Sequence, residues 1–449
     1  MPKALCLNSR TFAVLKFAYN RSFSPIGPVG GLGIVERLKK CTMMRSHGLV
    51  CIGVFIALYV VFYLDFVDIT LEPLKSNVNS SEDRRSARGS PYYDAIFDTC
   101  VLKEYPAWTP AMQKLLTPNY DPMKGCDRNW VPRTILGEDG IVRLHPKYRN
   151  MTDEKCWARA ILLQSEYKIK KGAWHTLDEN YTFENDIVET TCTNKTNKTT
   201  YTYLHYQVYR KREPPAEESD PTPSESSEEE PAEPFKPSVY VILFDSIAAT
   251  QALRTFPKTV KFLESDLEAI RFRHINKVGE NSRPNGVALF FGKLITYLNR
   301  EVYGLPTVEP DWEYDKFCKS FLDDDDFVIS DYEKLRGYTT FMAEDWDKGV
   351  FNWPSCYGFK KQPTTHYMRP FQIRLLKDTT PNLKTTMSPK RCHEHHKYLL
   401  NYLDKFIDAY PDKPKFALSW ASYLGHDYAN VPFHADQYIF DFFMKNKEE

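Results

Sequence analysis

The chain has 449 residues, of which 42% are hydrophobic and 14% aromatic. This length allows one large domain with additions, or two domains that each bury a sizeable core. The 59 lysine and arginine residues balance 59 aspartate and glutamate residues. The net charge of zero gives no electrostatic reason to expect nucleic acid as a partner.

One apolar segment predicts a membrane anchor. Residues 48–64, "GLVCIGVFIALYVVFYL", carry no charge, and the segment extends to residue 67 if Asp65 is included. This is about the length that crosses a hydrocarbon core. Basic residues precede it and acidic residues follow it: Lys39, Lys40 and Arg45, then Asp65, Asp68 and Glu72. Positive charge stays cytosolic, so we predict a type II single-pass protein whose ectodomain is extracellular or in the secretory-pathway lumen.

Sequons and cysteines after this segment agree with that orientation. Five Asn-x-Ser/Thr triplets predict glycosylation at Asn79, Asn150, Asn180, Asn194 and Asn197. Seven cysteines also follow the anchor, in a compartment where disulfides persist: Cys100, Cys126, Cys156, Cys192, Cys318, Cys356 and Cys392. Because seven is odd, one thiol is free, pairs with another chain, or lacks its partner.

Composition divides the chain into segments. We expect a cytoplasmic tail over 1–47, the signal-anchor over 48–67 and a stalk over 68–92. Residues 93–212 hold four of the outer cysteines and the strand-like "TTYTYLHYQVYRKR", which predicts a small disulfide-tied, strand-rich module. Residues 213–237 are rich in proline, glutamate and serine and read as a disordered linker.

Residues 238–449 alternate between strand-like and helix-like patterns. Strands are predicted at 238–245, 269–275 ("AIRFRHI"), 337–345 and 415–423. Helices are predicted around 250–269, from Pro284 onward, over 393–410 and over 434–446. This order predicts an α/β domain with a mainly parallel sheet flanked by helices. In such sheets the active site lies beyond the carboxyl ends of the strands.

Two residues at such positions could carry chemistry. Asp245 ends the first predicted strand, where its carboxylate could bind a cation such as Zn²⁺; a turn or capping role is the alternative. Ser282 leads into the helix at Pro284, and helix N-termini attract phosphate or sulfate. Beside a metal-bound carboxylate, its hydroxyl could attack phosphorus. The alternative is a serine that caps the helix.

This pair and its surroundings resemble the alkaline phosphatase and sulfatase superfamily. More closely, the chain resembles a membrane-anchored branch known as domain of unknown function 229. The matching stretches are "VILFDS", "FPKTVKFLES", "NKVGENSRPN", "GYTTFMAEDW", "HYMRPF" and "FALSWASYLGHDYAN". They span nearly all of residues 239–443, and the cysteine-rich part upstream also looks like that branch. The resemblance implies a two-metal fold with Asp245 as a metal ligand and Ser282 in the place of the nucleophile.

The resemblance also bears on the reaction. Formylglycine sulfatases carry Cys/Ser-x-Pro-x-Arg, whereas "SRPNG" ends in Gly286, so sulfatase chemistry is disfavoured. The Ser-x-Pro-Asn form is similar to the Thr-x-Pro-Asn of nucleotide phosphodiesterases. "GHDYAN" is similar to a metal-binding Gly-His-x-x-Gly stretch, which makes His426 a candidate ligand. Ser422 stands where phosphodiesterases carry a further aspartate.

The superfamily's Asp-His pair and final histidine are expected after the last helix, and the sequence up to Glu449 does not show them. The C-terminal part is therefore expected to be truncated. Two zinc ions need about three protein ligands each, and only Asp245, Ser282 and His426 are found. We expect a hydrolase-like ectodomain for phosphate or sulfate esters that is inactive or incomplete, with a divalent metal, zinc first, only if it is active.

Three further interpretations stay open. The ectodomain could bind a glycan or a protein without catalysis. "DDDD", residues 323–326, could be the Asp-x-Asp motif of a Golgi glycosyltransferase, although the following residues indicate the start of a helix. His393, His395 and His396 lie together on one predicted helix, where a solvated face is favoured over a metal site.

Overall fold

The computed structural model describes residues 12–13, 104–150, 152–211, 236–273, 275–377 and 381–448. From Tyr105 onward the chain belongs to one compact unit. The predicted anchor and stalk, with Asn79 and Cys100, and most of the predicted linker lie outside the described residues. Among the residues that are described, no helix is long and apolar enough to cross a membrane.

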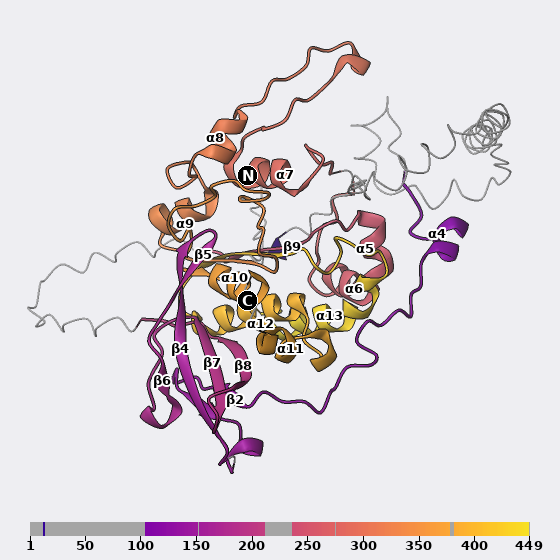
Figure 1. Cartoon of the computed structure of the whole chain (residues 1–449). Coiled ribbons are helices and arrows are strands. Elements are labelled where there is room, and N and C mark those ends of the chain that lie inside the picture. Colours follow the sequence, from indigo (N-terminus) through magenta and orange to yellow (C-terminus); the bar gives the residue numbers. More distant parts are fainter. Residues whose placement is uncertain are drawn as a thin grey trace, which may run out of the picture. The chain divides into compact units, whose positions relative to one another are not determined.

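A five-stranded parallel sheet lies at the centre of this unit (Figure 1), in the order β1-β9-β12-β10-β11. The strands are β1 (Phe12–Ala13), β9 (Val239–Phe244), β12 (Lys415–Ala421), β10 (Thr339–Glu344) and β11 (His366–Tyr367). Phe244 pairs with Ala421 and Glu344 with Trp420, so the three long strands end at the same level. The predicted α/β class with a mainly parallel sheet is confirmed.

Side chains of these strands alternate between two hydrophobic layers. On one face Tyr240, Phe341 and Ala417 pack with helices α5, α6, α10, α11, α12 and α13. On the other face Leu243, Met342 and Leu418 pack with α7 and α9. The helices are α5 (Ala249–Thr255), α6 (Pro257–Ser265), α7 (Ser282–Phe291), α9 (Val328–Arg336), α10 (Arg369–Lys377), α11 (Pro381–Thr386), α12 (His395–Ala409) and α13 (Asp436–Lys445).

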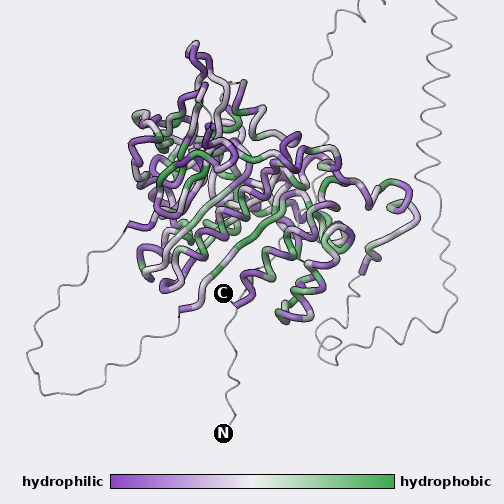
Figure 2. Tube along the Cα trace, turned by 90° about the horizontal axis from the view of Figure 1, so that it is seen from below, coloured by the Kyte–Doolittle hydropathy of each residue, from purple (hydrophilic) through white to green (hydrophobic). Residues whose placement is uncertain are grey.

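Burial on both faces explains the strand sequences. Every residue of β10 and β12 is buried, which is typical of a parallel sheet covered by helices on both sides and gives nearly continuous apolar runs. Figure 2 shows hydrophobic residues concentrated in the interior of the unit and polar residues along its outer loops. The strands expected near 238–245, 337–345 and 415–423 are therefore confirmed.

The predicted strand over 269–275 is wrong. The described residues there form no strand, and Ile270 and Phe272 are 78% and 60% exposed. The local pattern alternates, but β9 already has β1 and β12 as neighbours, so this segment has no free strand edge to join at that place. It instead leads from α6 to α7, and Ser282 follows a loop.

The part upstream is rich in strands, as expected for 93–212, and the structure shows that these strands pair antiparallel. It contains β2 (Thr134–Leu136), β3 (Val142–Leu144), β4 (Glu154–Ser165), β5 (Lys168–Lys171), β6 (His175–Thr176), β7 (Ile187–Asn194) and β8 (Thr199–Tyr206). Shorter pieces complete the fold: α4 (Pro110–Leu115), α8 (Tyr314–Lys319), η1 (Pro146–Tyr148), η2 (Leu177–Glu179), η3 (Glu301–Tyr303), η4 (Pro389–Arg391) and η5 (Val431–Ala435).

Three disulfides account for six of the seven outer cysteines. Cys156–Cys192 links directly opposed residues of β4 and β7. Cys318–Cys356 lies within the α/β part, and Cys126–Cys392 joins the strand-rich part to it. The seventh, Cys100, lies outside the described residues, so its state stays a prediction.

The predicted glycosylation sites that the structure describes are accessible to different degrees. Asn150, Asn180 and Asn197 are exposed, whereas Asn194 is half-buried. The Asn194 side-chain oxygen accepts from the backbone N–H of Thr196, 3.0 Å away. Glycosylation itself stays a prediction.

Strand β1 lies beside β9 at the edge of the parallel sheet. Phe12 and Ala13 pair with Tyr240 and Val241 of β9. These two residues belong to the segment expected as a cytoplasmic tail; the membrane topology stays a prediction.

Candidate functional site

Three neighbouring parallel strands are each followed by a polar residue. Asp245 follows β9, Asp345 follows β10 and Ser422 follows β12. Because the strands are parallel and end at one level, these residues share one edge of the sheet. Together with Ser282 and His426 we call them the carboxyl rim.

Asp245 and Ser282 are in direct contact at the rim. The Ser282 hydroxyl donates to Asp245 Oδ2 at 2.8 Å, and the indole N–H of Trp420 donates to the same oxygen at 3.2 Å. Ser246, the next residue along the chain, has a left-handed φ of 58°. Its hydroxyl oxygen is buried and has no hydrogen-bond partner within the described part of the chain. Strained turns of this kind cluster at functional sites.

The helix start at Ser282 follows from its sequence. Asn285 donates to the carbonyls of Gly279 and Asn281 at 2.8 and 2.7 Å, and its Oδ1 accepts from the N–H of Val278 at 2.9 Å. These bonds fold "VGENS" back onto the first turn of α7. Asn281 occupies the N-cap position, so the interpretation of Ser282 as the capping residue is wrong.

Gly286 is explained by packing. A Cβ atom there would lie 2.6 Å from Val350 Cγ2, so no larger side chain fits without movement. In the sulfatase signature this position is an arginine. The structure thus gives a steric reason for the departure noted in the sequence.

Asp345 is a rim residue that sequence reasoning missed. Its Oδ1 accepts from the N–H of Ser422 at 2.7 Å and from that of Tyr423 at 3.3 Å. Burial raises its pKa to about 7, against the lowering effect of these two N–H groups; repulsion from Asp245 and Glu344 adds to the rise. The available signal was the same as for Asp245, a carboxylate directly after a buried strand.

Glu344, the last residue of β10, is a second buried acid beside the rim. Its Oε1 accepts from the N–H of Val350 at 2.7 Å. Burial raises its pKa to about 7, partly offset by that hydrogen bond and by Arg369. A Cβ at Gly349 would lie 2.1 Å from Glu344 Oε2, so the glycine makes room for the carboxyl group.

His426 reaches the rim from the turn after β12. Its N–H donates to the carbonyl of Ser422 at 3.1 Å, and its ring lies 5.9 Å from the Trp346 ring. Gly425 allows this turn to pack closely, because a Cβ there would lie 2.6 Å from the Asp245 carbonyl. The Nδ1 of His426, however, faces Asp427 at 2.7 Å.

The charge of the rim suits a divalent cation, but its side chains do not surround one point as a complete ligand set would. Among the described residues, no basic side chain forms an ion pair with Asp245 or Asp345, and their oxygen atoms with that of Ser282 suit hard cations. Yet the described residues form no group of three ligating His, Cys, Asp or Glu side chains at the rim. Within the described part of the chain, the single such group with atoms inside 4.8 Å lies elsewhere. The residues present fit a weakly held cation.

The acidic run at 323–326 has structural contacts. Asp323 accepts from the N–H groups of Lys360 and Lys361 at 2.6 and 2.8 Å. Asp325 pairs with Lys316 at 2.7 Å, and α9 begins at Val328. These contacts favour the predicted helix start over a nucleotide-sugar site.

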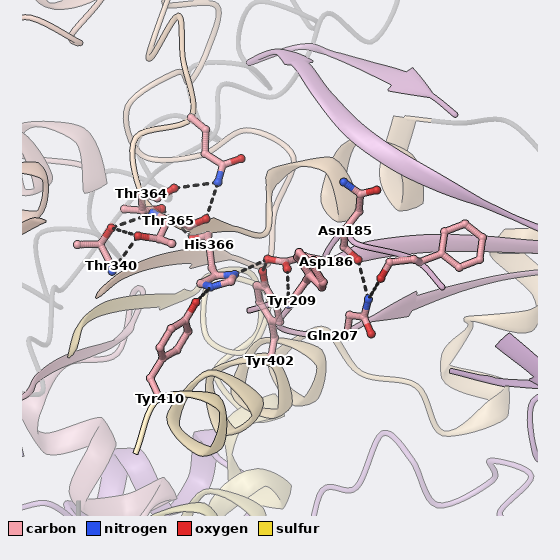
Figure 3. Close-up of polar contacts among 12 residues, drawn as sticks. Asn185, Asp186, Gln207, Tyr209, Thr340, Thr364, Thr365, His366, Tyr402 and Tyr410 are labelled. Atoms are coloured by element: carbon pink, nitrogen blue, oxygen red, sulfur yellow. Dashed lines mark hydrogen bonds and ion pairs between the residues drawn. The ribbon is translucent and has the colours of Figure 1, made fainter. Parts of the chain in front are cut away.

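A polar cavity lies at the opposite, amino-terminal edge of the parallel sheet. It has a volume of about 400 Å³ and lies between the α/β part and the strand-rich part. Thr339, His366 and Lys413 line it from the first, and Asp186 and Arg210 line it from the second. Figure 3 shows the network beside it: His366 binds Asp186 through Nδ1 at 2.7 Å and Tyr410 through Nε2 at 2.9 Å. The Nδ1 contact joins β11 to Asp186, next to β7 of the strand-rich part, and the Nε2 contact joins β11 to the end of α12.

The three histidines near the start of α12 do not form a solvated face. The His395 ring stacks on Tyr423 at 4.2 Å, and the His393 ring meets Trp130 edge-on at 5.1 Å. His396 is only 3% exposed. The predicted solvated face is wrong, because the loop after β12, with Tyr423, and the segment before β2, with Trp130, cover this end of α12.

The fold and the rim define a mixed α/β protein with a parallel sheet whose strand ends gather carboxylates. The chain belongs to the family described as Protein of unknown function (DUF229), whose model matches residues 124–449. No curated protein and no solved structure matches the chain.

Proposed function

We propose that the carboxyl rim is the site of a metal-dependent hydrolase-like protein for phosphate or sulfate esters, in a form with little or no turnover. The observation that carries this proposal is the 2.8 Å hydrogen bond from Ser282 to Asp245 at the first residue of α7. It joins a hydroxyl, a carboxylate and a helix N-terminus at the edge of the sheet where α/β proteins bind ligands.

An ester anion suits this place for electrostatic reasons. The first turn of α7 has N–H groups without intrahelical partners and the positive end of the helix dipole, which favour phosphate or sulfate. The Ser282 oxygen lies at that end. The steric limit at Gly286 supports phosphate esters ahead of formylglycine-type sulfate chemistry.

Low turnover follows from the weak activation of Ser282. A serine hydroxyl needs a base or a metal to become a nucleophile, and a bound divalent metal would supply that acidification and hold an ester oxygen. Asp245 and Asp345 supply carboxylates, but His426 is directed to Asp427. The rim therefore holds the hydroxyl in place without strongly acidifying it.

The test is hydrolysis by the full chain, purified in mild detergent and given zinc or manganese. Substrates are a generic aryl phosphodiester, a phosphomonoester and an aryl sulfate. We compare wild type with Ser282→Ala and with Ser265→Ala, an exposed serine that also donates to an aspartate, Asp266. All three proteins are expected to give the same near-background rate. Turnover by wild type and Ser265→Ala that is lost in Ser282→Ala would contradict low activity and make Ser282 a working nucleophile.

A further inference from the structure

A second group of metal-ligating side chains lies at the N-terminal end of α12. Glu394 occupies the N-cap position of α12 and His396 lies in its first turn. His434 comes from η5, in the connection between β12 and α13. One ligand atom from each residue lies within 4.8 Å of the other two.

The buried imidazole of His396 is the least satisfied member of this group. His396 is 3% exposed, and its Nε2 has no hydrogen-bond partner among the residues that the structure describes. Leaving such an atom unpaired costs roughly 1–3 kcal/mol, and buried polar atoms nearly always have a partner. Burial lowers the pKa of His396 to about 3, so the ring is neutral and can act as a ligand.

His434 has the hydrogen-bond pattern of a metal-bound histidine. Its Nδ1 faces the carbonyl of Val431. A carbonyl only accepts, so Nδ1 carries a hydrogen. Nε2 points the other way, toward the ionised carboxylate of Glu394, which also only accepts, so without a metal Nε2 carries a hydrogen that a bound cation would displace. Metal-ligating histidines usually donate their second N–H to a carbonyl or carboxylate in this manner, which fixes the ring orientation.

Glu394 supplies the negative charge of the group. It is 8% exposed, and one of its oxygens contacts His434 while Lys397 Nζ lies 2.6 Å from the other. Burial raises its pKa, but the bond with His434 and the nearby positive groups outweigh this and leave it at about 2. The carboxylate is therefore ionised at any pH at which a metal would bind.

We propose that Glu394, His396 and His434 form a binding site for a transition-metal cation of the zinc type. Two imidazole nitrogens and one carboxylate oxygen are a usual ligand set for Zn²⁺, with a fourth position left for water. The set is nitrogen-rich and buried, whereas the carboxyl rim offers mainly oxygen. It does not depend on the hydrolase proposal.

The position of this site indicates a structural role. A cation there would tie the start of α12 to the end of the loop from Ser422 to Ala435, which also carries His426. His395 already stacks on Tyr423 of that loop, and the Tyr423 N–H donates to Asp345. The cation would thus hold the loop that forms one side of the carboxyl rim.

The experiment uses the full chain, stripped with a chelator and titrated with Co²⁺ and then Zn²⁺. Visible absorption of Co²⁺ reports four-coordinate binding, and equilibrium dialysis gives the number of zinc ions per chain. We expect wild type to bind one ion and to melt at a higher temperature with zinc than without. His396→Gln is expected to weaken this binding by about 100-fold or more, because it removes one of three ligands.

Two controls separate this site from its surroundings. His395→Gln alters the neighbouring histidine outside the group, and Asp245→Asn alters the carboxyl rim; both are expected to bind the ion as wild type does. Folded wild type that shows no Co²⁺ absorption and takes up no zinc overturns the proposal, even if His396→Gln fails to fold. Binding that survives in His396→Gln but is lost in Asp245→Asn also overturns it and assigns the ion to the rim.

Discussion

Ser282 begins α7 but uses its hydroxyl to contact Asp245. Two further carboxyl groups lie near this pair, those of Asp345 and Glu344, and all three acids are buried. Two of them, Asp345 and Glu344, have pKa values raised to about 7. At the residue scale the rim is therefore an acidic, partly protonated site at neutral pH.

Glu344→Gln tests the cost of this buried charge. A carboxyl group whose pKa is raised in the folded state binds its proton more tightly there than in the unfolded chain. Its contribution to stability is therefore lost as pH rises from the pKa of the unfolded state, near 4.5, through that of the folded state, about 7. Glutamine removes that loss while keeping an oxygen for the Val350 N–H. We expect the variant to be more stable than wild type at pH 8.5, by on the order of 1–3 kcal/mol, and to differ little at pH 5.

Urea unfolding at both pH values, in the presence of a chelator, measures this difference. The exposed Glu309 provides the control, because Glu309→Gln should change stability by less than about 0.5 kcal/mol at either pH. A stability difference between Glu344→Gln and wild type that is the same at pH 5 and pH 8.5 would show that Glu344 is already ionised in the folded protein at pH 5.

The sequence could point to some of these residues and not to others. Asp245 could be predicted because a carboxylate after a buried strand lies at the ligand-binding edge. The same rule applied to Asp345 and would have found it. The Glu394–His396–His434 group could not be found this way, because His434 comes from another element and only folding brings it to α12.

At the scale of elements, α6 depends on a cap supplied from a distant helix. Asp436, the first residue of α13, accepts from the N–H of Lys258 at 2.9 Å and of Thr259 at 3.0 Å. The Thr259 hydroxyl donates to it at 2.8 Å. These are N–H groups of the first turn of α6, which have no partner inside the helix, and the negative charge suits the helix dipole.

Asp436→Asn is expected to lower the free energy of unfolding by ~1–3 kcal/mol. The asparagine amide has a single acceptor oxygen, so its NH₂ group would face one of the two backbone N–H donors, Lys258 or Thr259, and that hydrogen bond would be lost. Thermal or urea unfolding measures the change. Asp441→Asn, on the same helix, should change little, because Asp441 is exposed and accepts a hydrogen bond from the Gln437 side chain, 2.8 Å away on its own helix. Equal effects of the two substitutions would contradict the capping role.

Strands could be predicted from the sequence where burial on both faces requires a continuous run of apolar residues. β9, β10 and β12 are apolar runs because helices cover both faces of the sheet. The segment 269–275 alternates apolar and basic residues, as an exposed strand would, but its described residues form no strand, and both sides of β9 are already occupied by β1 and β12. Whether a strand edge is free is a property of the topology and is absent from any short stretch of sequence.

At the scale of the whole molecule, long-range contacts join the strand-rich part to the α/β part. The Cys126–Cys392 disulfide spans 266 residues. The Asp186–His366–Tyr410 network adds two polar contacts (Figure 3): Asp186 and His366 are 180 positions apart in the sequence, and His366 and Tyr410 are 44 positions apart. The His366 network lies at the amino-terminal edge of the parallel sheet, away from the carboxyl rim. The disulfide lies next to the start of α12, the end where His395 stacks on Tyr423 of the loop after β12.

The molecule thus offers a cation two different environments. The carboxyl rim supplies oxygen atoms in an open arrangement, and the Glu394 group supplies two nitrogens and an oxygen that lie within 4.8 Å of one another. Mn²⁺ prefers oxygen ligands and is the weakest of the common divalent transition metals at nitrogen sites. It can therefore report on the rim while zinc fills the other group.

The dissociation constant of Mn²⁺ at the rim, measured by electron paramagnetic resonance on zinc-loaded full chain, tests the central claim most directly. Wild type is expected to bind Mn²⁺ with a dissociation constant of roughly millimolar order, because the rim lacks a closed ligand set, and Asp245→Asn should weaken this binding further. Micromolar binding in wild type that Asp245→Asn abolishes would contradict the claim and would show a rim equipped for metal-dependent catalysis.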